Sequence, residues 1–399
     1  MSWRIENSDA LSLLRELPSE WAQTCVTSPP YWGLRDYGLP PATWGGNPKC
    51  RHSWGAMQRG RRGDLLPGCE TRSRGRLGID ERQGRAGVQG GRFCQRCGAW
   101  RGCLGLEPTP ELYVEHLVTV LDEVHRVLRS DGTLWLNLGD SYTSGGRTYR
   151  TPDPKLPRRG MRSERPPTPP GLKPKDLVGI PWRVAFALQA RGWWLRSDVI
   201  WVKPNPMPEN VRDRPTRAHE YLFLLTKQPR YFYDADSVRE PDANHCPSAG
   251  FARRGRLTYQ DRRGERAQHE QRRAGNGRQR RSWWKVTGRG YPGAQAVFPE
   301  KLVEPCILAG TAPTACGICG APWQRERATR LVEDGVWGPT CGHQNDAGRC
   351  LVLDPFCGSA TTGAVAHRLG RNFLGIELGR DTAKVARHRL QAITPEVKP

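Results

Sequence analysis

The feature that most constrains the fold is a strand–turn–helix–strand unit near the end of the sequence. Leu351–Asp354 is an apolar run, residues 355–360 are small or turn-forming except for Phe356, and residues 361–369 have the pattern of a helix. A second apolar run follows and ends at Glu377. When a helix connects two strands of one sheet, the two strands usually run parallel to each other. Because the same alternation recurs earlier in the chain, the sequence predicts an α/β fold with a mostly parallel, doubly wound sheet.

The longest predicted helix starts at Thr109, a capping residue that precedes Pro110 at the first helical position. Its apolar residues recur at helical spacing on one face. They are Tyr113, Leu117, Val120, Leu121, Val124, Val127 and Leu128. Further helices are predicted at residues 10–17 and 181–191, and further strands at residues 25–27, 133–138, 197–202 and 220–226.

Charge and cysteine content limit the class of protein. The chain of 399 residues has a net charge of +22, and nucleic acid is the commonest acidic partner of such a protein. A solubility bias in an arginine-rich genome is the alternative. With no run of 18 apolar residues and no apolar N-terminal stretch, neither a membrane span nor a signal peptide is expected. The 13 cysteines then indicate metal ligands and buried thiols in a reducing cytoplasm.

The acceptor loop, Thr27-Ser28-Pro29-Pro30-Tyr31, is the most informative stretch for chemistry. An exocyclic amino group is a poor nucleophile because its lone pair is delocalised into the ring, so a site that alkylates it must accept hydrogen bonds from both N–H groups. The Ser28 hydroxyl and the Pro29 carbonyl supply two acceptors. Proline holds them rigidly, and Tyr31 can stack on a base flipped out of a duplex. An ordinary extended loop is the alternative for this stretch alone.

The cofactor loop, residues 354–363, joins the strand at Leu351–Asp354 to the following helix. Small residues let a ligand approach the backbone there, and an acid such as Glu377 at the end of the next strand can accept hydrogen bonds from ribose hydroxyls. The loop is not a Walker motif and lacks the middle glycine of a dinucleotide fingerprint. A nucleoside cofactor is favoured over a plain structural turn. The candidate cofactor residues in this part of the chain are Asp354, Pro355, Phe356, Gly358, Thr361 and Glu377.

Together the two loops resemble the β class of DNA amino-methyltransferases, in which the acceptor loop precedes the cofactor loop. The resemblance implies a Rossmann-like fold with a circularly permuted motif order, S-adenosylmethionine as cofactor, Asp9 near its adenine and Phe298 near its methionine. Ser28, where the class also uses aspartate, resembles the cytosine-N4 enzymes. It therefore implies transfer to N4 of cytosine in duplex DNA, with N6 of adenine as the alternative. One departure is Ala360, where the motif usually has glycine.

Two cysteine–histidine clusters have the residue types and tight pair spacings of structural zinc sites. The first comprises Cys50, His52, Cys94 and Cys97, and the second Cys316, Cys319, Cys341 and His343. Cys350 is an alternative fourth ligand in the second cluster, and buried thiols without metal are the alternative for both. Because both clusters are complete with four ligands and methyl transfer needs no metal, the predicted zinc is structural.

The expected organisation follows these motifs. A catalytic core is interrupted by a basic zinc-binding insert, a target-recognition region and a second zinc-binding insert. The predicted boundaries are 1–36 (core with acceptor loop), 37–105 (first insert), 106–230 (core), 231–295 (target recognition) and 296–399 (cofactor-binding part, with the second insert at 312–350). Double-stranded DNA is the expected partner, a cognate restriction endonuclease a candidate partner, and a bacterial or phage-infected cytoplasm, at the nucleoid, the expected location.

Two other function classes stay open from the sequence. One is a zinc-dependent DNA-binding protein that has lost catalysis, with Ala360 as the lesion. The other is methylation of structured RNA or of protein glutamine, where a related Pro-Pro-Tyr loop occurs. A cytosine-C5 reaction is disfavoured, because it needs a cysteine nucleophile and Cys306 lies in a different sequence context.

Overall fold

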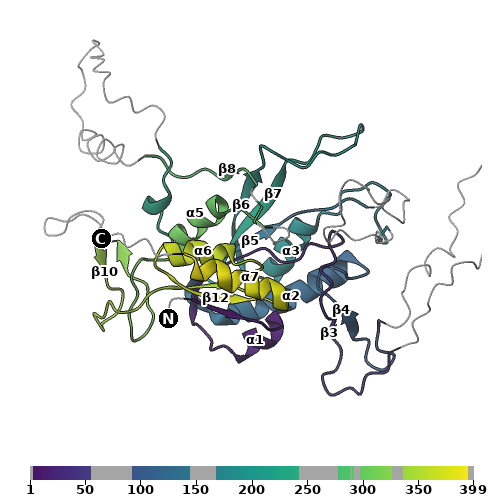
Figure 1. Cartoon of the computed structure of the whole chain (residues 1–399), viewed down its shortest axis with the longest axis horizontal. Helices are drawn as coiled ribbons and strands as arrows, with labels where there is room; N and C mark the ends of the chain where they lie inside the picture. Colours follow the sequence, from purple (N-terminus) through teal and green to yellow (C-terminus); the bar gives the residue numbers. More distant parts are fainter. Residues whose placement is uncertain are drawn as a thin grey trace, which may run out of the picture. The chain divides into compact units, whose positions relative to one another are not determined.

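The computed structural model describes residues 3–54, 92–143, 168–241, 277–288, 290–291, 297–325 and 336–393 (Figure 1). Two compact units are present. Unit 1 contains residues 1–29, 120–139 and 188–399, and unit 2 contains residues 30–119 and 140–187. Most arginine pairs of the predicted target-recognition region lie within residues 242–276, outside the described residues.

Unit 1 is built on an eight-stranded sheet with the order β1-β12-β11-β2-β5-β7-β6-β8. Neighbouring strands are parallel except at β7, which is antiparallel to both β5 and β6. The strands are β1 (Trp3–Glu6), β2 (Ala22–Thr27), β5 (Leu128–Leu138), β6 (Trp194–Val202), β7 (His219–Thr226), β8 (Trp283–Lys285), β11 (Leu351–Asp354) and β12 (Asn372–Ile376). All residues of β2 and β11 are buried, as expected for central strands covered on both faces.

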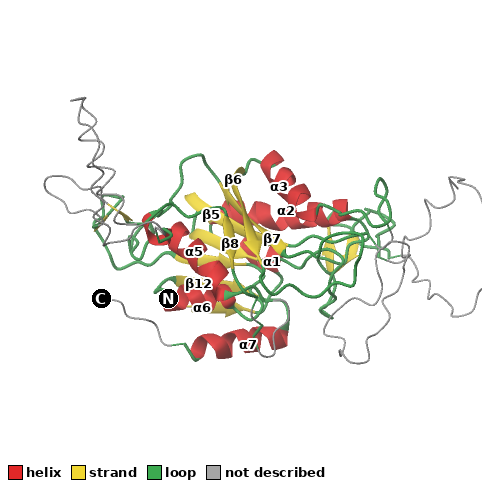
Figure 2. Cartoon of the chain, turned by 90° about the horizontal axis from the view of Figure 1, so that it is seen from above, coloured by secondary structure: helices red, strands yellow, loops and turns green. Residues whose placement is uncertain are grey.

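Helices α5 (Glu300–Gly310), α6 (Thr361–Arg368) and α7 (Arg380–Gln391) pack on one face of this sheet, over β1, β12, β11 and β2 (Figure 2). Their apolar residues join those of the sheet in one cluster. The other helices are α1 (Ala10–Glu16), α2 (Pro110–Val127), α3 (Ile180–Ala190) and the 3₁₀ helix η2 (Asp236–Val238), and two short strands, β9 (Gln324–Arg325) and β10 (Trp337–Gly338), pair with each other. No helix among the described residues is both long and apolar enough to cross a bilayer.

The sequence pattern of α2 explains why it forms. The Thr109 hydroxyl accepts a hydrogen bond from the Leu112 N–H at 3.2 Å and so caps the first turn. Every residue of the predicted apolar face is fully buried, and each such side chain contributes about 1.5–3 kcal/mol by leaving water. The strand β5 follows α2 at once at Leu128, so the prediction that this strand begins at Thr133 was wrong in its start.

Unit 2 contains a hairpin of β3 (Ala42–Trp44) and β4 (Trp100–Gly102) beside the first half of α2. The imidazole of His116 stacks between the rings of Trp44 and Trp100, with centroids 4.9 and 5.4 Å away. This packing joins the described part of the first predicted insert to α2. Residues 55–91 of that insert lie outside the described residues.

Candidate functional site

The acceptor loop and the cofactor loop start side by side, because β2 and β11 are neighbouring parallel strands whose carboxyl ends meet. The Thr27 hydroxyl, at the end of β2, donates to the Asp354 carboxylate at 2.6 Å. Thr362, in the first turn of α6, has its hydroxyl oxygen 2.8 Å from the other Asp354 oxygen and 3.1 Å from the Val26 carbonyl. These contacts join the two loops that the sequence had singled out separately.

Asp354 carries a proton more readily than an ordinary aspartate. Complete burial raises its pKa to about 7, although hydrogen bonds from Thr27, Thr362 and the Phe356 N–H oppose the shift. The Thr362 hydroxyl has one proton and two acceptors within reach. If Asp354 is protonated, its own O–H can donate to Thr362 while Thr362 donates to the Val26 carbonyl. The geometry therefore agrees with the direction of the shift.

A pH dependence of stability follows from Asp354. Because its folded-state pKa lies above the ordinary value of about 3.9, the folded state holds the proton more tightly. Its contribution to stability is full below pH ~4 and is lost as the pH rises towards about 7. We expect the loss from this group to approach 1.4 kcal/mol per pH unit, to order of magnitude. Chemical denaturation of wild type and Asp354→Asn across this range measures it. An unchanged slope in the variant would contradict the assignment to Asp354.

The body of the cofactor loop is held by backbone hydrogen bonds to Glu377. Its carboxylate accepts from the Gly358 N–H at 3.0 Å and from the Gly379 N–H at 2.7 Å. Burial raises the pKa of Glu377, and these two N–H groups oppose the shift. Ala360 has φ +57°, in the left-handed region that favours glycine, which explains the usual glycine there. Its methyl group is fully buried within the apolar cluster of unit 1.

Arg389 of α7 holds the start of α6 through hydrogen bonds of its side chain. Its buried guanidinium donates to the Ser359 carbonyl at 3.2 Å, to the Thr361 hydroxyl at 3.1 Å and to Glu300 at 2.7 Å. The sequence analysis did not identify Arg389. Its signal was weak, because an arginine at an apolar helix position is usually a surface residue whose stem lies along the protein.

Four predicted cofactor residues lie in well-defined environments of unit 1. Asp9 caps α1, accepting from the Ser12 N–H at 2.9 Å. Its neighbour Asn7 donates to the Glu377 carbonyl at 2.8 Å, which ties the end of β1 to the end of β12. Phe298 is half-buried against the apolar cluster at the start of α5, and Pro355 is buried beside the half-buried Phe356.

The acceptor loop continues from Pro29, the last residue of its segment of unit 1, into unit 2 at Pro30. There the Tyr113 hydroxyl donates to the Pro30 carbonyl at 2.9 Å. Gly105 has φ +89°, and a Cβ at this position would stand 3.1 Å from the Tyr31 carbonyl oxygen. Tyr31 is half-buried. The Tyr113 hydrogen bond and the close approach of Gly105 both restrict the backbone at Pro30 and Tyr31.

A buried acid–imidazole pair supports this arrangement within unit 2. One oxygen of Glu107 accepts from the Gly105 N–H at 2.7 Å, and the other lies 3.1 Å from Nδ1 of His116. Burial raises the pKa of Glu107 against the opposing effect of His116. The Trp32 indole N–H donates to the Glu107 carbonyl at 3.0 Å. Glu107, His116 and Tyr113 were not predicted as site residues, since isolated residues of these types are frequent in ordinary cores.

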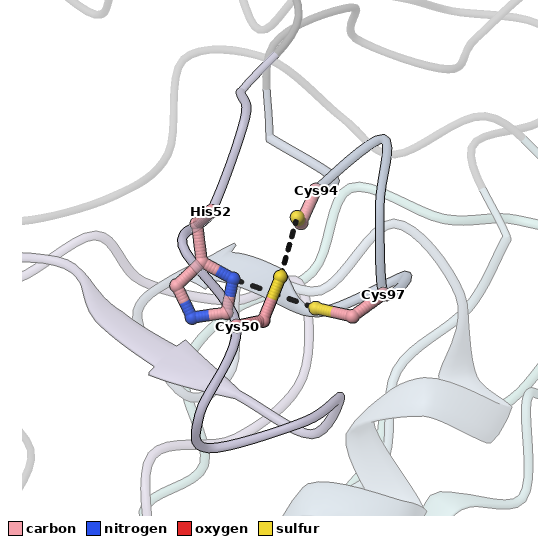
Figure 3. A group of neighbouring side chains, drawn as sticks. All are labelled: Cys50, His52, Cys94 and Cys97. Carbon is pink, nitrogen blue, oxygen red and sulfur yellow. Dashed lines mark hydrogen bonds between the residues drawn. The ribbon is translucent and has the colours of Figure 1, made fainter.

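Each cysteine–histidine cluster comes together in the fold, and within each the ligand atoms lie within 4.8 Å of one another. Figure 3 shows the first, in which Cys50 Sγ is 3.9 Å from Cys94 Sγ and Cys97 Sγ is 3.4 Å from His52 Nδ1. In the second, Cys316 Sγ is 3.7 Å from His343 Nδ1. Corners of a tetrahedral zinc site with sulfur and nitrogen ligands stand about 3.5–3.8 Å apart. Both sets therefore fit zinc.

The two Cys-x-x-Cys turns share one hydrogen-bond pattern. The Gly98 N–H donates to the Cys94 carbonyl and the Gly320 N–H to the Cys316 carbonyl, each at 2.9 Å. An N–H two residues on lies 3.4 Å from the first sulfur in both turns, a contact that favours a thiolate. Cys350 is buried in a separate apolar cluster and does not join the second set.

Cys306 cannot act as a ready nucleophile. It is fully buried inside α5, its thiol donates to the Leu302 carbonyl at 3.2 Å, and burial raises its pKa far above the ordinary range. A thiolate is needed for attack, so the arrangement gives a cytosine-C5 mechanism no support.

Comparisons with known proteins identify the family of the chain. Residues 22–388 match the N6/N4 methyltransferase family described as DNA methylase. The chain is 39% identical to the Type II methyltransferase M.Cfr9I of Citrobacter freundii, over 96% of this chain and 86% of the relative. It is 37% identical to the Type II methyltransferase M.SmaI of Serratia marcescens, over 98% and 91%. The solved structure of PvuII DNA methyltransferase (cytosine-N4-specific) has a similar fold, with a TM-score of 0.50 and 14% identity over 100% of this chain and 89% of that one.

Proposed function

Because the chain belongs to the N6/N4 family of DNA methylases, and is thus an S-adenosylmethionine-dependent DNA amino-methyltransferase, we propose that it methylates N4 of cytosine in duplex DNA. The observation that carries the proposal is the hydrogen-bonded link through Asp354 between the acceptor loop and the cofactor loop. It keeps the ends of β2 and β11 in one register, so an amino group held by one loop can face a methyl donor held by the other.

The acceptor loop performs the chemistry by hydrogen bonding and positioning. Ser28 Oγ and the Pro29 carbonyl accept hydrogen bonds from the two N–H groups of the amino group. This draws the nitrogen lone pair out of conjugation with the ring. Tyr31 stacks on the base after it has left the duplex. No covalent enzyme intermediate forms, and the rate gain comes mainly from orientation of the reacting atoms.

The cofactor loop and the residues around it include the groups expected to hold the adenosyl and methionine parts of the cofactor. With the cofactor bound, Glu377 would accept from the ribose hydroxyls, Gly358 and Phe356 would line the approach to the backbone, and Asp9 and Phe298 would hold the adenine and the methionine. Thr361 and Pro355 hold the loop. When bound, S-adenosylmethionine supplies an electrophilic methyl group. The left-handed Ala360 places its methyl inside the protein, which argues against steric loss of cofactor binding and so against the catalytically inactive alternative.

The choice of cytosine over adenine rests on Ser28 in the acceptor motif, and N6-adenine transfer is the alternative. We also propose that each cysteine–histidine cluster holds one structural zinc ion and that residues 231–295 carry target recognition. The motif order corresponds to a circular permutation, with the acceptor strand β2 preceding the cofactor strand β11 in sequence. The relatives named as Type II methyltransferases suggest a cognate endonuclease partner in a bacterial cytoplasm.

The decisive experiment is methyl transfer from labelled S-adenosylmethionine to unmethylated duplex DNA, followed by mass analysis of the nucleosides. The expected product is N4-methylcytosine. S-Adenosylhomocysteine in place of the methyl donor is the control. N6-Methyladenine would keep the mechanism and reverse the base. Label in RNA or protein but in no DNA nucleoside would reject DNA as the substrate.

Tyr113 is a positioning residue in this scheme, because it touches the Pro30 carbonyl and not the reacting atoms. Tyr113→Phe removes one hydrogen bond that positions the half-buried acceptor loop, and we expect kcat to fall by about tenfold. KM for S-adenosylmethionine should stay unchanged, since the cofactor loop is intact. A matched loss of thermal stability with normal kcat would instead assign Tyr113 to folding alone.

A further inference from the structure

A pocket lies within unit 1, apart from the acceptor loop and the cofactor loop. It has a volume of about 200 Å³ and is walled by β5, β6, β7, β8 and the segments around Tyr231 and Arg280. It shares no lining residue with the acceptor or cofactor loop.

Two N–H groups at this pocket are buried without an acceptor among the described residues. They are the indole N–H of Trp135 and the Nε–H of Arg280. Trp135, in the middle of β5, is only 2% exposed. A buried donor left unsatisfied costs about 1–3 kcal/mol, so such a group usually has a partner that is not protein. Neither donor thus finds its acceptor among the described residues.

The charge of the pocket identifies the kind of acceptor. Arg196, Arg280 and Arg281 line it, and none of its described lining residues is acidic. Arg281 is engaged by Glu240 at 2.9 Å, whereas no ion pair to Arg280 is found among the described residues. The guanidinium carbon of Arg280 lies 4.5 Å from the ring centroid of Trp284, which fixes the plane of the guanidinium. Fixed N–H donors and a net positive wall select an anion with several acceptor oxygens.

The remaining walls are flat and apolar. Tyr231, Tyr233 and Trp284 present rings beside Val199 and Leu224. The backbone beside Tyr233 is held in place, because the adjacent Asp234 accepts a hydrogen bond from Arg325 at 3.0 Å. A simple inorganic anion uses no such surface, but the sugar or base of a nucleotide does.

We propose that this pocket binds a phosphate ester, with Trp135 Nε1 and Arg280 Nε donating to its oxygens and the aromatic rings contacting the attached sugar or base. The ester is either a backbone phosphodiester of DNA or a free nucleotide. Binding of a DNA phosphodiester rests on the proposed function, in which duplex DNA is the substrate. Binding of a free nucleotide does not depend on that function.

The test compares Arg280→Gln and Trp135→Phe with Arg15→Gln, which removes one exposed charge on α1. For a DNA phosphodiester, Arg280→Gln weakens binding of a short duplex about tenfold at low salt. It also lowers the slope of log K against log salt by about 0.9. Trp135→Phe weakens binding with no change of slope, because it removes a donor but no charge. Arg15→Gln changes neither, and thermal unfolding establishes that each variant is folded.

The second arm uses deoxycytidine monophosphate in equilibrium dialysis. Binding by wild type that is lost in Arg280→Gln and Trp135→Phe, with an unchanged duplex slope, identifies a free nucleotide as the source. If neither probe separates these variants from Arg15→Gln, the proposal is overturned. Labelled methyl transfer is read separately. A failure of transfer with intact Arg280-dependent binding rejects the proposed function and leaves the phosphate pocket standing.

Discussion

Replacing Ser28 by alanine is expected to lower kcat for methyl transfer by about 10²–10³-fold, the loss seen when one preorganised hydrogen-bonding group is removed from a reacting centre. Ser28 directly follows Thr27, whose hydroxyl is anchored on Asp354 at 2.6 Å. The loop is thus anchored at the residue before Ser28, and alanine removes the side-chain acceptor that follows this anchor. The affinity for S-adenosylmethionine should therefore stay within about twofold, because the cofactor loop is untouched.

A matched variant separates loss of the acceptor from loss of shape. Ser28→Asp restores a hydrogen-bond acceptor at the same backbone position, and it should recover part of the activity lost in Ser28→Ala. Single-turnover rates with saturating cofactor measure the chemical step alone. Normal single-turnover transfer by Ser28→Ala would remove Ser28 from the mechanism and leave the Pro29 carbonyl as the main acceptor.

The parts of the site that could be predicted are those whose chemistry lies in adjacent residues. The acceptor loop, the cofactor loop and Glu377 are short motifs that follow strands, and periodicity places those strands well. Strand β11 was predicted with its observed bounds, and α6 to within one residue. The mixed sheet was predicted as mostly parallel, and the antiparallel β7 is its exception.

The missed residues act through contacts between distant parts of the sequence. Arg389 reaches Thr361 across 28 positions, and Tyr113 reaches Pro30 across 83. Nothing in local periodicity distinguishes them from core or surface residues of the same type. Helices α5 and α7 were missed for a related reason. Pro305 interrupts the pattern of the first, and charged residues dilute that of the second, so packing on the sheet decides both.

Removal of zinc is expected to have the largest effect on stability. In each cluster the four ligands come from two chain segments, which in the first are residues 50–52 and 94–97. A few hydrogen bonds also join these two segments, among them Gln95 N–H to the Ser53 carbonyl at 2.9 Å and the Arg96 guanidinium to the Arg51 carbonyl at 3.1 Å. Structural zinc supplies about 10–16 kcal/mol in small zinc peptides, and several kcal/mol of folding free energy are expected from each site here. Chelation should therefore unfold both clusters, whereas the sheet of unit 1 keeps its own core.

Ligand variants with matched controls test the two sites one at a time. Native mass analysis should find two zinc ions in wild type and one in either Cys97→Ser or His343→Ala. The controls Cys103→Ser and Cys350→Ala change cysteines outside the clusters and should keep both ions. Hydrogen exchange should then show lost protection of the Cys94–Gly98 turn in Cys97→Ser alone. Zinc loss in Cys350→Ala but not in His343→Ala would show that Cys350, and not His343, is the fourth ligand of the second cluster. A metal-free wild type with protected turns would show that packing alone holds the clusters, because no ion would then be needed to bring their thiols together.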